Sequence, residues 1–126
     1  AIIRLPMVFG SLSPRNNEIK LLLKLDEPIE LFPNLIMNVT TAKKVSQQLH
    51  YIINRNKNGI YHLGSSDLVC HDDFIKELVK KMDFNNTRYK LVYTTNNSRY
   101  LAVLPRENKL PKHLQMKSEE VLDDMI

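Results

Sequence analysis

The first ten residues, Ala1-Ile2-Ile3-Arg4-Leu5-Pro6-Met7-Val8-Phe9-Gly10, constrain the fold more than any other segment. They form an apolar run that ends at a turn-rich stretch over residues 10–14, which predicts a strand over residues 1–8. A strand this apolar is typical of the middle of a sheet, with both faces covered. Because a central strand at a chain terminus indicates that other strands precede it, we expect this chain to be the later part of a larger protein.

The composition of the 126 residues is that of an ordinary globular domain, with 43% hydrophobic and 25% charged residues. No apolar stretch approaches the roughly 20 residues of a membrane-spanning helix, and the first residues lack the order of a secretory signal. Cys70 is the single cysteine, so no internal disulfide forms, and we expect a packing role for it. These features predict a cytoplasmic protein without a membrane partner.

The net charge of +4 and the isoelectric point near 9.2 raise the question of nucleic-acid binding. The lysines are interleaved with carboxylates and amides on the outer faces of predicted helices, as at Lys43 and Lys44. No basic block is combined with aromatic residues into a stacking surface. A small nucleic-acid-binding domain is therefore the weakest of three functional hypotheses.

Hydrophobic periodicity predicts alternating strands and helices along the rest of the chain. A helix is expected to begin near residues 14–17 and to cover 18–25, where its apolar residues are too continuous for a surface helix, and Pro28 ends it. The other predicted elements are strands at 29–32, 59–64 and 89–94, helices from Thr40 or Thr41 to 54 and at 71–82, a polar turn at 96–98, an irregular segment around Pro105 and Pro111, and a last helix at 119–125 capped by Ser118. This order predicts the α/β class.

Two of these helices are amphipathic and predict part of the core. Their apolar stripes are Val45, Leu49, Ile52 and Ile53 in the first helix, and Phe74, Ile75, Leu78, Val79 and Met82 in the second. The second helix opens with His71-Asp72-Asp73, where carboxylates are favoured by the helix dipole. That explanation fits the cluster better than a metal or acid–base site.

The sequence lacks the common catalytic and phosphate-binding motifs. Neither G-x-G-x-x-G nor G-x-x-x-x-G-K-[ST] occurs, since the three glycines, Gly10, Gly59 and Gly64, are not clustered. G-x-S-x-G is absent, the histidines have no metal-ligand spacing, and one cysteine cannot build a structural zinc site. No tyrosine has a lysine four positions later, as the Tyr-Lys pair of a reductase requires. The residues themselves therefore predict no catalytic residue and no metal site.

Five segments nevertheless carry related motifs in a fixed order. They are I-R-L-P-M-V-F-G at 3–10, N-V-T-T-A-K-K-V at 38–45, N-G-I-Y-H-L-G at 58–64, D-F-I-K at 73–76 and L-P-K-H-L-Q-M-K-S at 110–118. In order and spacing they resemble the extended short-chain dehydrogenase/reductases, in which the R-x-x-x-V-[YF]-G strand follows the catalytic Y-x-x-x-K helix. The subgroup that they resemble most is the dTDP-4-dehydrorhamnose reductase-like sugar-nucleotide reductases.

The resemblance implies the α/β fold of the carboxyl-terminal part of a Rossmann-like protein, with the last sheet strands and a small substrate-binding lobe over residues 1–126. It places the glycine-rich turn for NAD or NADP and the Tyr-Lys pair before Ala1, so that the chain alone binds no cofactor. It implies cofactor contacts for Leu5, Pro6 and Met7, and contacts to a nucleotide sugar for Met7, Thr40 and Lys112. Leu5 and Met7 also suit core positions, and for Leu5 we favour the core.

The sequence also departs from the family pattern. Lys44 stands where the family has Asp, Val39 replaces a Pro, and Leu110 replaces the Arg before Pro111. The leading hypothesis is the substrate-binding portion of an NAD(P)-dependent sugar-nucleotide reductase or epimerase, which transfers hydride at a sugar carbonyl and is inactive in this portion alone. The second is a non-catalytic regulatory or scaffold subunit of the same ancestry. In either case a truncated sheet would expose an unpaired edge and an apolar face, which favours self-association.

Overall fold

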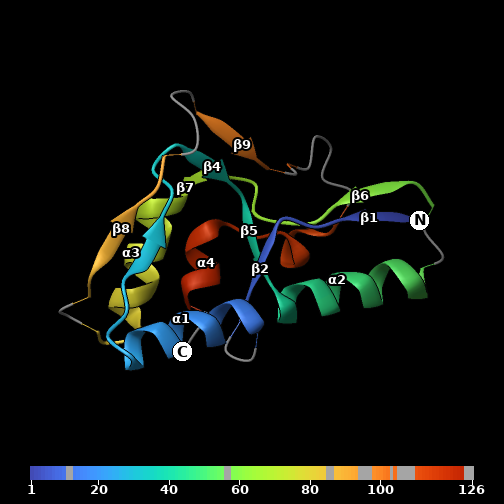
Figure 1. Ribbon diagram of the computed structural model, residues 1–126. Coiled ribbons are helices and arrows are strands. Elements are labelled where there is room, and N and C mark those ends of the chain that lie inside the picture. Colours follow the sequence, from blue (N-terminus) through green and yellow to red (C-terminus); the bar gives the residue numbers. More distant parts are fainter. Residues whose placement is uncertain are drawn as a thin grey trace.

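The computed structural model describes residues 1–10, 13–55, 58–84, 87–93, 98–102, 104 and 110–123. Strands and helices alternate along the chain, as the sequence predicts (Figure 1). In order they are β1 (Ile2–Arg4), β2 (Met7–Phe9), α1 (Pro14–Lys24), β3 (Ile29–Leu31), β4 (Leu35–Met37), β5 (Val39–Thr41), α2 (Ala42–Asn54), β6 (Ile60–His62), β7 (Val69–Cys70), α3 (His71–Lys81), β8 (Tyr89–Leu91), β9 (Arg99–Leu101), the 3₁₀ turn η1 (Lys112–Leu114) and α4 (Ser118–Asp123). The helices of these ranges include none that is long and apolar enough to span a bilayer.

The strands form small, mainly parallel sheets. β1 pairs with β6, β2 with β5 and β3 with β8, each time in parallel. β4 lies between β9, which is parallel to it, and β7, which is antiparallel. Because parallel neighbours need a crossover connection, a helix lies in sequence between the two strands of each parallel pair. The predicted α/β class is confirmed.

The first predicted strand is broken in two. Leu5 and Pro6 separate β1 from β2, since proline has no N–H to donate to a strand ladder. Phe9 at the end of β2 is fully buried, whereas Ile2 and Leu5 are 57% and 46% exposed. The prediction of a strand covered on both faces is therefore wrong for β1, and so is the core position favoured for Leu5. Among the described strands β6 alone pairs with β1, while Ile3 in the middle of β1 packs against the cluster of side chains from α2 and β6.

Helix α1 begins where the sequence predicts but lies at the surface. The Ser13 hydroxyl accepts a hydrogen bond from the backbone N–H of Asn16 at 3.3 Å, and Pro14 occupies the first turn, where its missing N–H costs nothing. Ile19 is buried, while Leu21 is 56% exposed. The expectation that this helix is too apolar for a surface position is wrong, because one stripe of it meets the core and the rest faces solvent.

In helix α2, hydrophobic periodicity predicts the burial of one residue wrongly. The Thr41 hydroxyl accepts a hydrogen bond from the backbone N–H three residues later at 3.1 Å, which confirms Thr41 as the N-cap. Ile52 is buried as predicted, but Ile53 is 72% exposed. Gln48 is buried in its place and donates a hydrogen bond from Nε2 to the Leu114 carbonyl at 2.7 Å. The hydrogen bond of Gln48 therefore connects α2 with η1.

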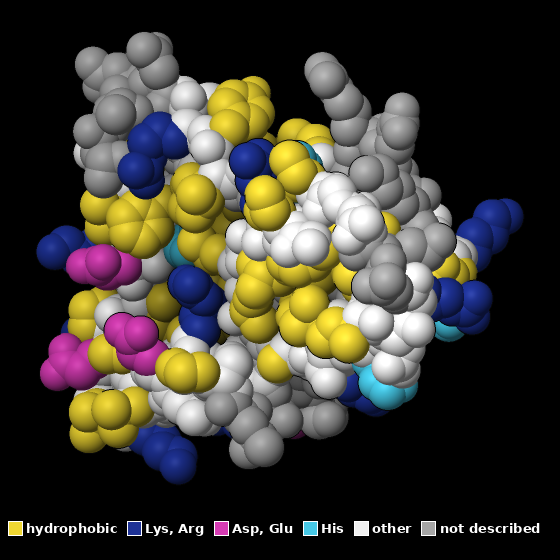
Figure 2. Space-filling model, turned by 90° about the vertical axis from the view of Figure 1, so that its right-hand side faces the viewer, with side chains coloured by type: hydrophobic (Ala, Val, Ile, Leu, Met, Phe, Trp, Pro, Cys, Tyr) yellow, Lys and Arg dark blue, Asp and Glu magenta, His cyan; other side chains and the backbone are white. Residues whose placement is uncertain are grey.

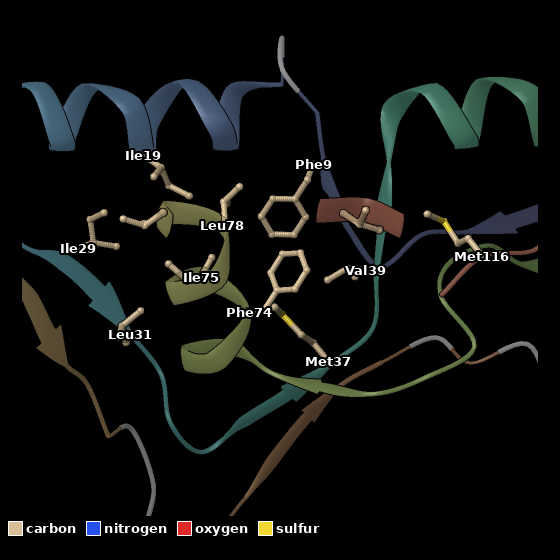
Figure 3. Close-up of a cluster of buried hydrophobic side chains, with 12 residues drawn as sticks. Phe9, Ile19, Ile29, Leu31, Met37, Val39, Phe74, Ile75, Leu78 and Met116 are labelled. Atoms are coloured by element: carbon tan, nitrogen blue, oxygen red, sulfur yellow. The ribbon is translucent and has the colours of Figure 1, made fainter. Parts of the chain in front are cut away.

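Most of the interior is one cluster of side chains from β2, β3, β4, β5 and the helices α1, α3 and α4 (Figure 3). The rings of Phe9 and Phe74 face each other with centres 5.0 Å apart and planes at 54°. The other members are Ile19, Ile29, Leu31, Met37, Val39, Ile75, Leu78, Val79, Met116 and Val121. The stripe predicted for α3 is confirmed, with Met82 partly buried at its end. A second cluster joins α2, β6 and η1.

Helix α4 begins at Ser118, and its start is held by a residue far away in sequence. One carboxylate oxygen of Asp67 accepts a hydrogen bond from the Ser118 N–H at 2.8 Å, and the other accepts the Ser118 hydroxyl proton. A carboxylate suits this place because the helix dipole is positive there. The predicted cap Ser118 is thus a hydrogen-bond donor to Asp67. The predicted element parts at 94, 96–97, 105 and 124–125 lie outside the described residues.

Candidate functional site

A pocket of about 380 Å³ opens between α1, β2, β3 and the start of α3. Its wall is largely apolar and includes the aromatic side chains of Phe9 and Phe32. The polar side chains of the wall are Arg15, Glu18, Glu30 and His71. A concave, mainly apolar wall with a few convergent polar groups is typical of a small-molecule site.

The turn between β2 and α1 places a cation at this pocket. Gly10 has a φ of +146°, a backbone conformation that glycine adopts without strain. The side-chain oxygen of Asn16, a fully buried residue, accepts hydrogen bonds from the Gly10 N–H at 3.1 Å and from the Ser13 hydroxyl at 2.9 Å. The helix start is therefore fixed to the strand end. The Arg15 guanidinium lies over the Phe9 ring, 5.6 Å from its centre.

His71 contributes an imidazole ring to the same pocket. Its Nδ1 accepts a hydrogen bond from the backbone N–H of Phe32 at 3.1 Å. The two rings meet edge to face, with centres 5.1 Å apart and planes at 76°. Burial lowers the pKa of His71 to about 4, the charge of Asp72 opposes this change, and the charge of Arg15 adds to it. The imidazole is therefore neutral near pH 7.

The lowered pKa of His71 predicts a loss of stability in acid. An unfolded chain protonates this histidine near pH 6.5, whereas the folded chain resists protonation until about pH 4. Stability from the neutral ring is thus complete above pH 6.5 and declines as the pH falls toward 4. In urea unfolding at pH 7, 6, 5 and 4.5, we expect wild type to lose more stability than His71→Asn, which keeps an acceptor for Phe32. Equal pH dependence of the two proteins would contradict this role.

The residues that the resemblance implies for substrate binding lie in three different environments. Met7 lines the pocket. Thr40 is fully buried in β5, and its hydroxyl donates to the sulfur of Met116 at 3.3 Å. Lys112 is exposed in η1, beside a second depression of about 350 Å³ that Lys44 also lines. The structure does not bring these three predicted residues together in one pocket.

The resemblance implies cofactor contacts for Met7 and for the two residues before it, Leu5 and Pro6. The side chain of Leu5 is almost half exposed, and Pro6 packs closely against Gly64. A Cβ atom added at Gly64 would lie 2.7 Å from the Pro6 Cγ. Leu5 offers exposed apolar surface of the kind that a cofactor ring contacts, and the contact itself stays a prediction.

Sequence reasoning missed Arg15, Phe32 and His71 as pocket residues. A usable signal existed for His71, because it lies three and four positions before Phe74 and Ile75, and so on the buried stripe of α3. Phe32 has no such signal. Its contact with His71 joins residues 39 positions apart, and spacing along the chain does not reveal it.

Cys70 and the acidic start of α3 show no sign of a reactive centre. The ligand atoms of Cys70, Asp72 and Asp73 lie within 4.8 Å of one another. Burial, followed by the charges of Asp73 and Asp72, raises the pKa of the Cys70 thiol. A raised pKa disfavours the thiolate that nucleophilic attack and metal binding require.

The chain resembles solved enzymes over nearly its whole length. It aligns with dTDP-4-dehydrorhamnose reductase of Bacillus anthracis in complex with NADP, with a TM-score of 0.78 and 20% identity over 97% of this chain and 46% of that chain. For WbmH of Bordetella bronchiseptica in complex with NAD⁺, the TM-score is 0.74 and the identity 12%, over 98% and 43%. For UDP-glucuronic acid 4-epimerase of Bacillus cereus with UDP-glucuronic acid and NAD, they are 0.68 and 14%, over 98% and 43%.

The chain shares its α/β fold with a part of each of these three enzymes. It spans less than half the length of each of them. No family model and no curated protein sequence matches the chain. The predicted resemblance to dTDP-4-dehydrorhamnose reductases and NAD-dependent epimerases is therefore confirmed at the level of the fold.

Proposed function

We propose that residues 1–126 are the substrate-binding portion of an NAD(P)-dependent reductase or epimerase that acts on a nucleotide-linked sugar. The observation that carries the proposal is the pocket beside Met7 and Arg15, in a chain whose fold matches three enzymes that act with NAD or NADP. One of those enzymes was crystallised with UDP-glucuronic acid. Arg15 and the aromatic walls suit a phosphate group linked to rings, and the carboxylates of Glu18 and Glu30, which also line the pocket, suit the hydroxyl groups of a sugar.

In this proposal the chain binds and orients the substrate, and the proton and hydride steps depend on residues outside these 126. When bound, the nicotinamide ring supplies or accepts a hydride at the sugar carbonyl. Leu5 and Pro6 would contact the apolar face of the nicotinamide ring, since the exposed apolar surface of Leu5 lies just before β2. Met7 would face the sugar and exclude water from it. Thr40 and Lys112 remain substrate contacts on the resemblance alone, since Thr40 is fully buried and Lys112 lies beside another depression.

A second candidate function is a non-catalytic subunit built on the same fold. The observation that favours it is Lys44, which carries a cation where the family has a carboxylate and donates from Nζ to the His113 carbonyl at 3.4 Å. Nucleic-acid binding gains no support from the face of the molecule drawn in Figure 2. Basic side chains are scattered over the face drawn in Figure 2, and the acidic ones gather along its left side.

Calorimetric titration of the chain with UDP-glucuronic acid and with dTDP tests the proposed function. We expect saturable binding of at least one probe and a loss of about tenfold or more in Arg15→Ala, because a charge-assisted hydrogen bond contributes about 1.5–3 kcal/mol. Lys24→Ala, which removes the same charge from the end of α1 away from the pocket, is the matched control and should bind like wild type.

Two outcomes would contradict the proposed function. Absence of binding by the wild-type chain to both probes contradicts the nucleotide-sugar site. Turnover of NADH or NADPH by the 126 residues alone contradicts the assignment of the cofactor and proton-transfer residues to another part of the enzyme.

A further inference from the structure

The orientation of the His71 ring is fixed from one side. Its Nδ1 accepts the Phe32 backbone N–H at 3.1 Å, and an acceptor nitrogen carries no proton. A neutral imidazole then holds its proton on Nε2. The Phe32 ring, edge to face with the imidazole, restricts rotation about the same side chain. The ring of His71 is therefore held in one orientation, and its single donor is the N–H at Nε2.

His71 lines the pocket and is 7% exposed. Among the described residues, the buried side-chain polar atoms without a partner are Gln48 Oε1 and Thr87 Oγ1, and no atom of His71 is one of them. No hydrogen bond from Nε2 to the described residues is observed either, so Nε2 keeps some contact with solvent. Because the ring is part of the pocket wall, the pocket is where a ligand would meet this nitrogen.

The groups around the ring keep this donor neutral. Arg15 on α1 disfavours a second positive charge, and Asp72 on α3 acts in the opposite direction. Glu18 on α1 and Glu30 on β3 complete the charged groups of the wall. Because burial outweighs the acidic neighbour, the ring does not become an imidazolium near pH 7. It donates one hydrogen bond without offering a charge to an anion.

We propose that His71 determines ligand specificity in this pocket by donating a hydrogen bond from Nε2 to a carbonyl or hydroxyl oxygen of an uncharged ring of the ligand. Arg15, on the neighbouring wall, binds the anionic part of the ligand. The inference rests on the proposed nucleotide-sugar site and adds a division of labour within it. A ring that lacks an oxygen at this position leaves a desolvated N–H without a partner and binds less well.

Two substitutions separate the donor role from the structural role of His71. Asn at position 71 keeps an acceptor oxygen for the Phe32 N–H and removes the Nε2 donor. Gln places an amide N–H near the position of Nε2 and gives up the inner acceptor. In calorimetric titration with UDP-glucuronic acid at pH 7.5, we expect His71→Asn to weaken binding about five- to tenfold and His71→Gln to recover most of the affinity.

The opposite order of affinities, or wild-type affinity in His71→Asn, would overturn the donor role while leaving Arg15→Ala and the proposed function intact. Failure of the wild-type chain to bind UDP-glucuronic acid and dTDP overturns both. NMR of the ring nitrogens in the wild-type chain needs no variant. We expect protonation on Nε2 at pH 7.5 and a shift of Nε2 on addition of UDP-glucuronic acid, and a proton on Nδ1 or an unmoved Nε2 would contradict the proposal.

Discussion

Gly64→Ala is expected to lower the free energy of unfolding by about 3 kcal/mol or more. Gly64 has a φ of +147°, which an alanine adopts only with strain. The added Cβ would also lie 2.7 Å from Asn38 Nδ2 and 2.7 Å from Pro6 Cγ. Neither neighbour yields easily, because the proline ring is rigid and Asn38 is fully buried and donates to the Ser65 carbonyl at 3.1 Å.

Gly10→Ala is the matched control for this substitution. Its φ of +146° is nearly the same, but an added Cβ would come no closer than 3.9 Å to Ala42, an ordinary contact. We expect Gly10→Ala to cost about 1–2 kcal/mol, the backbone strain alone. Urea unfolding of the two variants measures the difference, which reports the clash at Gly64. Equal losses in the two variants would show that the close approach of Pro6 contributes nothing.

The same contact matters for the proposed site. Pro6 lies between Leu5, which we assign to the cofactor, and Met7, which lines the pocket. The close contact between Pro6 and Gly64 therefore fixes the position of residues 5–7 relative to Gly64. In the titration with UDP-glucuronic acid, a shift of the segment in Gly64→Ala should also weaken binding, whereas Lys24→Ala should not.

How much of the fold the sequence predicts depends on the range of the interactions involved. The helix α3 and its stripe were predicted because a repeat of Phe74, Ile75 and Leu78 is local information. A truncated sheet predicts an exposed apolar face, but the sequence does not tell that Ile2 and Leu5 belong to it, because an apolar strand has the same pattern whether or not another layer covers it. The surface position of α1 escaped prediction for the same reason.

The site was less predictable than the fold. Motif resemblance selected Met7, Thr40 and Lys112; Met7 lines the pocket, whereas Thr40 is buried in β5 and Lys112 lies beside another depression, and the roles of all three stay predictions. The pocket instead depends on contacts between distant segments. The acidic start of α3 concealed His71, since carboxylates at a helix start need no functional explanation.

Phe74→Ala is expected to destabilise the chain by about 3–5 kcal/mol, because it removes a buried aromatic ring and leaves a cavity in the main core. The loss should reach the pocket as well. Phe74 packs against Phe9 (Figure 3), and the guanidinium of Arg15 lies over the Phe9 ring. Once Phe9 can move toward the cavity, Arg15 loses its fixed place, and the affinity for UDP-glucuronic acid should fall.

Phe84→Ala is the control for Phe74→Ala, since it makes the same chemical change where the ring is 37% exposed. We expect it to cost about 1 kcal/mol and to leave ligand affinity unchanged. Urea unfolding and titration of both variants test the two parts separately. If Phe74→Ala destabilised the chain but bound UDP-glucuronic acid like wild type, the support of Arg15 by the Phe9–Phe74 pair would be disproved. Equal destabilisation by both variants would instead contradict the placement of Phe74 in the core.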